Sequence, residues 1–475
     1  MSGATPTDEG RPLTDLGVCE AADAIAGGEL SPVSYLDAFL ARIDARAETL
    51  NAFRTVMVQE ARSAALEAEQ AVERGEPLGR LHGIPIALKD NIAVRGVPLT
   101  ASSGFLRDNV AAEDAEVVRR LRDHGAVIVG KLHMAEWAIG ATTQNIHYGV
   151  GRNAWDLDRT PGGSSGGSGA ATGADLVPVA LGTDTGGSVR VPASLNGVSG
   201  LRPTAGRVSN RGTIPVAWTF DTVGPLARRV EDVARVLEAI EGHDPDDPAS
   251  ADRSGGGYEA AMAEGGQGLR IGVLGPEFRA GLPAETDSLL DAAAATMERL
   301  GARIETVEIS GLEEAIELTA DLMMAEAAAF HAERFAQRPD GFAPDVQARL
   351  RRGAAITGPQ YGLGREQQRA WTKRVISAIA GLDLLLAPAA PIPAPLIAES
   401  DPLATTGVLA RFFSTFALAR TPALVIPVGL SEQEGLPLGM QLVGRPFEEG
   451  TLFRAARAYQ RETDWHQRRP PRLGP

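Results

Sequence analysis

The sequence of 475 residues contains one cysteine, three lysines and no long hydrophobic stretch. Because Cys19 stands alone, an intrachain disulfide and a metal site built from several thiolates are both excluded. The longest run without charge, residues 384–398, contains four prolines and is too short to cross a bilayer. The first 13 residues lack the basic and apolar regions of a signal peptide, so we expect a cytoplasmic protein.

Basic residues are also few relative to acidic ones. The chain has 46 Lys and Arg against 61 Asp and Glu, which gives a net charge of −15 at pH 7. Such a surface repels polyanions, so we expect no direct binding to nucleic acid or to an anionic membrane. A hydrophobic content of 44% with 23% charged residues is typical of a folded globular protein and excludes a disordered or fibrous chain.

The scarcity of lysine is itself informative. Only Lys89, Lys131 and Lys373 are lysines, and the other 43 of the 46 basic residues are arginines. An amine can lose its proton, whereas guanidinium cannot, so a retained lysine can mark a site that needs a base. Lys373 belongs to an amphipathic run and is predicted to face solvent. Lys89 and Lys131 follow apolar, strand-like runs and are the candidates for a functional amine.

The hydrophobic pattern predicts helices that alternate with strands. GIPIALKD predicts a strand ending at Lys89, followed by a helix that stops at Gly125 and a strand over 126–129. Two strands around one helix form a βαβ unit, which implies parallel pairing. The fold class is therefore α/β, with a mixed, largely central sheet covered by helices on both faces. Further helices are predicted to start at Ser31-Pro32, to span 58–73, to end at Gly242, to span 284–300 and to lie near 450–463. Further strands are predicted in VPVAL, LRIGVLG, ARIETVEI, LDLLLAPAAP, ALVIPVGL and LGMQLVGR.

One break in composition interrupts this pattern. The stretch from residue 243 to about 268 begins HDPDDPASADRSGGG and is rich in Asp, Pro, Ser and Gly, which indicates a linker or a long surface loop. Strand-like runs lie on both sides of it, so we expect one domain over 13–475 with a single continuous sheet. Residues 1–12 read as a flexible N-terminal tail.

Two glycine-rich segments carry the strongest functional signal. PGGSSGGSG spans residues 161–169, and LGTDTGGSVRVP spans residues 181–192. A loop of this composition presents free backbone N–H groups that bind an anion, either a phosphate or the oxyanion of a tetrahedral intermediate. Phosphate-binding motifs fit poorly, because no lysine follows either cluster. The GxGxxA match at 149–154 lacks the strand before it and the helix after it that a dinucleotide site needs.

The possible nucleophiles can be narrowed by the same reasoning. Cys19 would have to serve a nitrilase-like Cys-Glu-Lys site, but it lies among small residues and is better interpreted as a packed hydrophobe. The seven histidines contain no HExxH, and His82, His124 and His133 have no metal-ligand spacing, so we expect no metal. A serine activated by a lysine remains, and the lysine count points to Lys89.

At this point a family resemblance becomes specific. GIPIALKDNI, PGGSSGGSG and GTDTGGSVRVPASLNGVSGLRPT resemble the amidase signature family of Ser-Ser-Lys hydrolases. The similarity continues through TFDTVGPLARRVEDVARVLEAI, DLLLAPAAP and GLPLGMQLVGRPFEE, and so covers nearly the whole chain from about residue 13. The resemblance implies the amidase signature fold and an enzyme that uses no cofactor.

The resemblance also implies roles for individual residues. Ser188 would be the nucleophile, Lys89 the base, and Ser164, after a cis peptide bond at Gly163-Ser164, the bridging serine. The backbone N–H groups of residues 185–188 (Thr185, Gly186, Gly187 and Ser188) would form the oxyanion hole. Supporting side chains would be Ser165, Thr183, Asp184 and Arg190, although ordinary loop hydrogen bonds explain these residues equally well.

The substrate pocket is harder to locate from sequence. Segments 134–143 and 214–220 each place a tryptophan and small residues in a predicted loop, so Trp137, Gly140 and Trp218 are candidates for substrate contact. The two tryptophans fit the protein core equally well.

Three functions remain open. The first is a hydrolase that cleaves a small carboxamide, anilide or carbamate through a Ser188 acyl-enzyme. Its expected partners are a small amide, ester or carbamate substrate and, if it forms a homodimer, a second copy of the chain. The second is the glutaminase subunit of a tRNA-dependent amidotransferase, against which the chain has Asp221-Thr222 where such subunits usually have Asp-Gln. The third is a non-catalytic scaffold that has kept the fold.

Overall fold

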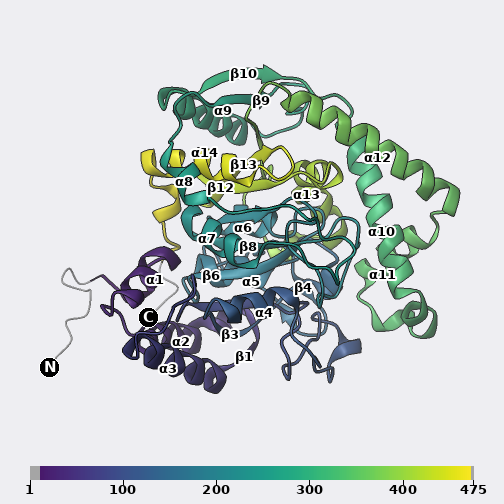
Figure 1. Ribbon diagram of the computed structural model, residues 1–475. Helices are drawn as coiled ribbons and strands as arrows, with labels where there is room; N and C mark the ends of the chain where they lie inside the picture. The colour runs from purple at the N-terminus through teal and green to yellow at the C-terminus, as the bar shows by residue number, and fades with distance from the viewer. Residues whose placement is uncertain (1–10, 472–475) are drawn as a thin grey trace.

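The computed structural model describes residues 11–471, and these contain fourteen α-helices and thirteen strands (Figure 1). The helices are α1 Val18–Ala26, α2 Pro32–Leu50, α3 Val58–Glu73, α4 Glu116–Asp123, α5 Gly166–Gly173, α6 Arg190–Asn196, α7 Val230–Ile240, α8 Tyr258–Ala263, α9 Ala284–Arg299, α10 Leu312–Gln337, α11 Pro344–Ala354, α12 Gly358–Ile379, α13 Pro402–Leu418 and α14 Glu449–Glu462. The strands are β1 Phe53–Val56, β2 Pro85–Lys89, β3 Val127–Leu132, β4 Gln144–Asn145, β5 Gly149–Val150, β6 Val179–Asp184, β7 Ser199–Arg202, β8 Thr222–Ala227, β9 Arg270–Leu274, β10 Arg303–Val307, β11 Leu384–Pro388, β12 Ala423–Leu430 and β13 Pro437–Gly444. The tail predicted over 1–12 lies outside the described residues except for its last two positions.

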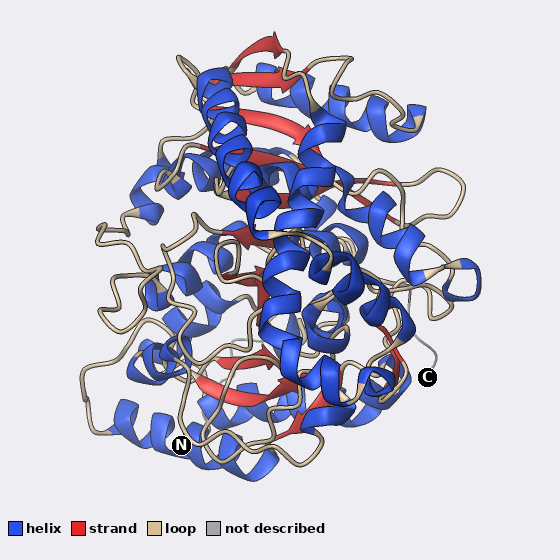
Figure 2. Cartoon of the chain, turned by 90° about the vertical axis from the view of Figure 1, so that its right-hand side faces the viewer, coloured by secondary structure: helices blue, strands red, loops and turns tan. Residues whose placement is uncertain are grey.

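Eleven strands form one mixed sheet in the order β1-β3-β2-β6-β8-β7-β12-β13-β11-β9-β10. β2 pairs in parallel with β3, as the predicted βαβ unit requires, and β9 pairs in parallel with β10 in a second strand–helix–strand unit. β2 also pairs in parallel with β6. The strands before the 243–268 segment meet those after it where β7 runs antiparallel to β12. Figure 2 shows the strands stacked from one end of the molecule to the other.

Helices cover both faces of this sheet, which confirms the predicted fold class. Side chains that alternate along one strand enter different hydrophobic clusters: Ile86 and Leu88 face a cluster that includes residues of α4, α7 and α14, while Ala87 faces α2, α3 and α5. This alternation with a period of two is what a strand with two covered faces requires. Helices α10, α11 and α12 lie together on the right of Figure 1, and the first two contribute to the wall of the pocket described below.

The 161–169 segment differs from its prediction as a loop, because α5 begins at Gly166 within it. Glycine disfavours a helix, and here close packing provides the compensation. A Cβ at Gly167 would lie 2.5 Å from the carbonyl oxygens of Ala52 and His133, so no larger residue fits between this helix and its neighbours. The glycines thus allow α5 to approach the sheet closely.

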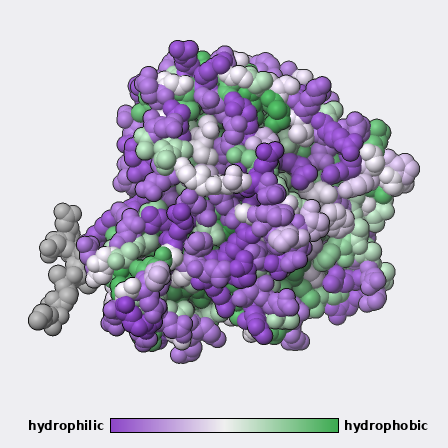
Figure 3. Space-filling view, in the orientation of Figure 1, coloured by the Kyte–Doolittle hydropathy of each residue, from purple (hydrophilic) through white to green (hydrophobic). Residues whose placement is uncertain are grey.

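The surface fits the composition. The face shown in Figure 3 is mainly hydrophilic, with hydrophobic residues scattered among polar ones. Within residues 11–471, no helix combines the length and the apolar character that crossing a bilayer needs.

Candidate active site

Three segments bring the predicted catalytic residues together. Lys89 ends β2, Ser164 lies just before α5, and residues 185–188 follow β6. Because β2 and β6 are parallel neighbours, their carboxyl ends lie at the same edge of the sheet, where ligands usually bind in α/β proteins. The peptide bond between Gly163 and Ser164 is cis, as the resemblance implied.

Lys89 is fully buried and contacts only uncharged groups. Its Nζ lies 2.7 Å from Ser164 Oγ, 2.8 Å from Thr183 Oγ1 and 3.3 Å from the Thr183 carbonyl oxygen. Burial lowers the pKa of Lys89 to about 7, with the more distant Asp221 and Asp184 opposing the shift. A large part of this lysine is therefore neutral near pH 7, which is the form that can accept a proton.

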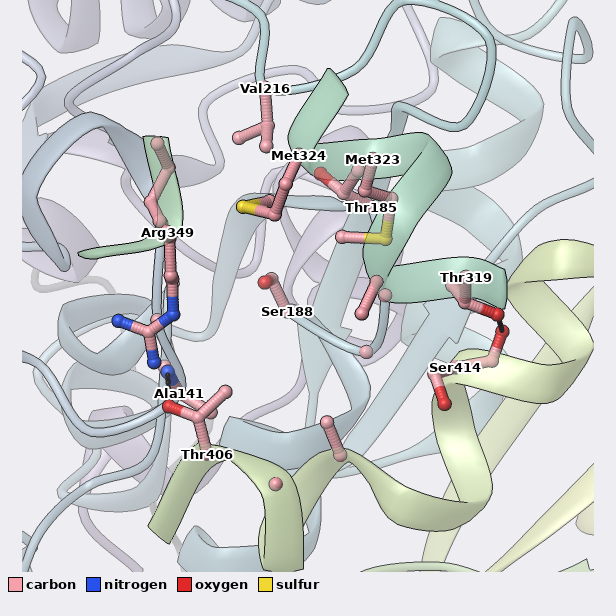
Figure 4. Close-up of a pocket in the computed structure, with 18 of the residues that line it drawn as sticks. Ala141, Thr185, Ser188, Val216, Thr319, Met323, Met324, Arg349, Thr406 and Ser414 are labelled. Atoms are coloured by element: carbon pink, nitrogen blue, oxygen red, sulfur yellow. Dashed lines mark hydrogen bonds between the residues drawn. The ribbon is translucent and has the colours of Figure 1, made fainter. Parts of the chain in front are cut away.

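Ser188 lies on the turn that follows β6. Its carbonyl oxygen accepts a hydrogen bond from Ser165 N at 3.2 Å, which joins the turn to the start of α5. Its hydroxyl makes no hydrogen bond to another protein group within residues 11–471. Figure 4 shows the side chain in a pocket, between Arg349 on one side and Met323 and Met324 on the other. The Ser188 hydroxyl is thus free to meet a substrate, and its link to Ser164 stays a prediction.

The turn before Ser188 provides fewer free N–H groups than the sequence suggested. Gly187 N donates to Asp184 Oδ1 at 2.9 Å, so this N–H group is already used inside the protein. The N–H groups of Thr185, Gly186 and Ser188 have no acceptor within the described part of the chain. These three groups remain candidates for the oxyanion hole, and Gly187 instead gives the turn its shape with a φ of 133°.

A buried ion network holds this turn. Asp184 Oδ2 lies 2.9 Å from Arg190 Nε, and Asp184 Oδ1 lies 3.1 Å from Arg202 Nη1. Burial alone would raise the pKa of Asp184, but the two guanidinium groups hold it well below its usual range. Asp184 and Arg190 thus stabilise the conformation of the turn. Ser165 donates through its Oγ to the Thr183 carbonyl oxygen at 3.3 Å. Sequence reasoning had missed Arg202.

A second carboxylate, which the sequence analysis did not nominate as a site residue, also supports the turn. Asp221 Oδ1 accepts from Thr185 Oγ1 at 2.6 Å, and Oδ2 accepts from the N–H groups of Val216 and Ala217. Burial raises the pKa of Asp221 to about 6. The only signal in the sequence was its position in the family-like stretch TFDTVGP. Asp221 joins the turn that carries Ser188 to the loop that carries Val216.

The pocket above Ser188 has a volume of about 380 Å³. Of the three candidates for substrate contact, Gly140 is a lining residue and the two tryptophans are not. Trp137 is buried in an aromatic cluster, with its ring centroid 4.5 Å from that of His331, and Trp218 is 48% exposed outside the lining. The wall comes from the 138–141 loop, α10, α11, α13 and the Ser188 turn, together with Gly163, Val191 and Val216. The lining contributed by the three helices is Ile316, Thr319, Ala320, Met323, Met324, Ala348, Arg349, Arg352, Leu403, Thr406, Gly407, Ala410 and Ser414.

Cys19, the alternative nucleophile, lies elsewhere. It is on α1, where its N–H group donates to Asp232 and its thiol contacts the Glu231 carbonyl oxygen. Burial raises the pKa of this thiol well above its ordinary value, which disfavours the reactive thiolate. Residues 11–471 contain no group of three or more His, Cys, Asp or Glu side chains placed to hold a metal ion.

Comparison with known proteins gives a consistent picture. A protein-family model described as Amidase matches residues 34–453. A glutamyl-tRNA(Gln) amidotransferase subunit from Anaeromyxobacter dehalogenans is 41% identical, over 97% of this chain and 98% of its own. A solved protein from a vestigial complex linked to the origin of an s-triazine catabolic enzyme is 36% identical, with a TM-score of 0.90 over 94% of this chain and 98% of that one. The peptide amidase of Stenotrophomonas maltophilia is 32% identical, with a TM-score of 0.86 over 99% of this chain and 100% of that one.

These names correct one expectation. For the small-amide hydrolase, the expected partners were a small substrate and a second copy of the chain, with no direct contact to nucleic acid; other subunits entered only with the amidotransferase alternative. That expectation is wrong in light of relatives that are 38–41% identical and named as one subunit of a glutamyl-tRNA(Gln) amidotransferase. The net negative charge bears on direct binding to polyanions and says nothing about protein partners.

Proposed function

This chain belongs to the amidase signature family of hydrolases, and from that membership we propose that it cleaves an amide C–N bond through a covalent acyl-enzyme on Ser188. The observation that carries the proposal is the 2.7 Å contact between a fully buried Lys89 and Ser164, beside a turn that leaves the Ser188 hydroxyl free. A serine hydroxyl becomes a good nucleophile only when a neighbouring base takes its proton.

The proposed reaction has two halves. Neutral Lys89 accepts the Ser164 proton, and Ser164 takes the Ser188 proton while Ser188 Oγ attacks the carbonyl carbon. The N–H groups of Thr185, Gly186 and Ser188 bind the resulting oxyanion; one such donor is typically worth about 2.7–4 kcal/mol. The same relay returns the proton to the amine as the C–N bond breaks. Water then cleaves the ester, which releases a carboxylic acid and restores Ser188.

The nucleophile can be tested directly. We expect Ser188→Ala to abolish amide hydrolysis and labelling by a fluorophosphonate probe, with little change in thermal unfolding. Ser168→Ala is a matched control, because Ser168 is also a buried serine of the glycine-rich segments but donates to the Leu181 carbonyl oxygen. Turnover by a pure Ser188→Ala preparation would refute the assignment. A wild-type protein that is not labelled at Ser188 would instead favour a non-catalytic scaffold.

A second candidate is the glutaminase subunit of a tRNA-dependent amidotransferase. It is favoured by relatives that are about 40% identical over almost their whole length and carry that enzyme's name. The Arg349 guanidinium in the pocket wall offers a group that a glutamine carboxylate can approach. Two observations oppose this candidate: Thr222 follows Asp221, and no acidic side chain lines the described pocket to receive the ammonium group.

The two candidates predict different substrates and partners. A glutaminase subunit should release ammonia from glutamine and should copurify with other subunits from its native cell. A free-standing amidase should cleave simple carboxamides, anilides or carbamates as the isolated chain, without stimulation by other proteins. Purification of the tagged chain from its own cells, followed by both assays on the bound fraction, distinguishes the two.

A further inference from the structure

The hydroxyl groups that the helices contribute to the wall of the pocket are already occupied by the protein itself. The hydroxyls of Thr319, Thr406 and Ser414 donate to main-chain oxygens one turn earlier in their own helices, at 2.6, 2.7 and 3.3 Å. Thr406 Oγ1 also accepts from Ala141 N at 3.0 Å. A substrate therefore finds few free hydrogen-bonding groups in this part of the wall.

The two charged side chains of the wall, Arg349 and Arg352, are likewise paired with groups of the protein. Arg349 lies 2.5 Å from the Asp345 carboxylate and donates to a main-chain oxygen at 2.9 Å. Arg352 lies 2.6 Å from Glu317 and 2.8 Å from Asp321. No Asp or Glu is among the described lining residues. An ammonium group in the pocket would lack a counter-charge, and a carboxylate would have to compete with carboxylates already in place.

The rest of the wall is apolar. Ile316, Ala320, Met323 and Met324 form one face of α10 toward the pocket, and the two methionines lie opposite Arg349 in Figure 4. Met323 reaches the turn itself, since a Cβ at Gly186 would lie 3.2 Å from both Sδ and Cε of Met323. Methionine side chains are flexible and pack against apolar groups of varied shape.

We propose that this site selects amides whose acyl group is uncharged and apolar, and that Met323 is the side chain that sets this preference. The proposal rests on the function proposed for Ser188 and adds the class of substrate. A pocket of about 380 Å³ has room for a medium-length alkyl chain or an aromatic ring, since ligand pockets of roughly 300–1,000 Å³ hold whole small molecules. Glutamine, with two charges near its amide, is then a poor substrate.

A matched set of primary amides tests the preference in the wild-type chain. We expect kcat/KM to rise about fourfold per methylene from butanamide to hexanamide, which corresponds to about 0.8 kcal/mol for each buried methylene. We expect 6-aminohexanamide and the monoamide of adipic acid, which add one charge at the end of the same chain, to fall below hexanamide by at least about tenfold. A flat series, or a charged amide equal to hexanamide, overturns the proposal.

Variants of Met323 locate the preference. Met323→Glu should lower kcat/KM for hexanamide and raise it for 6-aminohexanamide, whereas Leu363→Glu, on an exposed position of α12 outside the lining, should change neither. If Met323→Glu does not fold, Met323→Ala should still reduce the gain per methylene. An unchanged substrate ratio in every folded Met323 variant overturns the role of Met323.

Binding to Ser188→Ala separates this proposal from the one on which it rests. Calorimetric titration of that variant with hexanamide and with 6-aminohexanamide reports pocket preference without any chemistry. Preferred binding of hexanamide together with an absence of wild-type turnover refutes the proposed function and supports the apolar pocket. Turnover with equal or weaker binding of hexanamide supports the function and overturns the apolar pocket.

Discussion

Lys89→Met removes an amine that burial has made costly to charge, while keeping a side chain of similar length. In the unfolded chain a lysine has its ordinary pKa of 10.5, whereas in the folded protein burial lowers the pKa of Lys89 to about 7. Between these two values the unfolded state binds more protons than the folded state. The free energy of unfolding of the wild type must therefore rise with pH across this window, and the variant must lack that rise.

The size of the effect follows from the two pKa values. Between pH 6 and pH 9 the wild type should gain about 3 kcal/mol of stability relative to Lys89→Met. Lost hydrogen bonds to Ser164 and Thr183 affect both pH values alike and cancel in this difference. Catalysis should follow the same titration, because most of Lys89 is charged at pH 6 and most is neutral at pH 8, which gives about a tenfold increase in kcat/KM.

Two measurements check this reasoning. Urea unfolding followed by tryptophan fluorescence at several pH values from 6 to 9 gives the stability difference, and initial rates over the same range give kcat/KM. Lys373→Met, on an exposed position of α12, is the matched control and should follow the wild type. If the stability difference between Lys89→Met and the wild type stays constant from pH 6 to pH 9, Lys89 does not titrate in this range. The base assignment is then wrong.

Three further outcomes are expected. Lys89→Ala should lose about 10²–10⁴-fold more activity on an anilide than on an aryl ester of the same acid, because only the leaving amine needs the relayed proton. Ser164→Ala should change the ratio of ester to anilide activity in the same direction but less. Equal losses on both substrates contradict the relay. Gly167→Ala should lower the free energy of unfolding by about 1–3 kcal/mol, since its Cβ would meet two carbonyl oxygens at 2.5 Å. Gly362→Ala, with no atom within 4 Å, is its control and should not destabilise the chain in the same urea titration. Asp184→Asn should cost about 3–5 kcal/mol in that titration, because two buried guanidinium groups lose their charge partner, and a near-neutral result would contradict this account.

The sequence predicted several of the apolar strands and missed others. The runs that became β2, β12 and β13 are hydrophobic enough to be recognised without any knowledge of their neighbours. β7 and β8 were not predicted, because SGLR has a single large apolar side chain and a Gly-Pro pair interrupts the apolar residues of TVGPLA. Local preference was overridden there by pairing with strands distant in sequence.

The active site was also predicted only in part from the sequence. Residue chemistry nominated Lys89 and a serine that a lysine activates, whereas the choice of Ser164 and Ser188 came from the resemblance to the amidase signature family. Which backbone groups stay free could not be deduced, since the use of Gly187 N by Asp184 depends on how a short segment folds back on itself. The pocket could not be deduced either, because its wall comes from α10, α11 and α13, far from the glycine-rich segments along the chain.

The two buried lysines explain why burial alone does not make a base. Lys131 on β3 is as fully buried as Lys89 on the adjacent β2, and burial lowers the pKa of both. Lys131 Nζ, however, lies 3.1 Å from an Asp90 carboxylate oxygen, which favours the charged form and keeps its proton in place. Lys89 meets only hydroxyl and carbonyl oxygens, and the nearest carboxylates act on it from beyond hydrogen-bonding distance. The two interior lysines thus have opposite surroundings: Lys131 lies in a buried ion pair, whereas Lys89 contacts Ser164, with which the proposed mechanism has it exchange a proton.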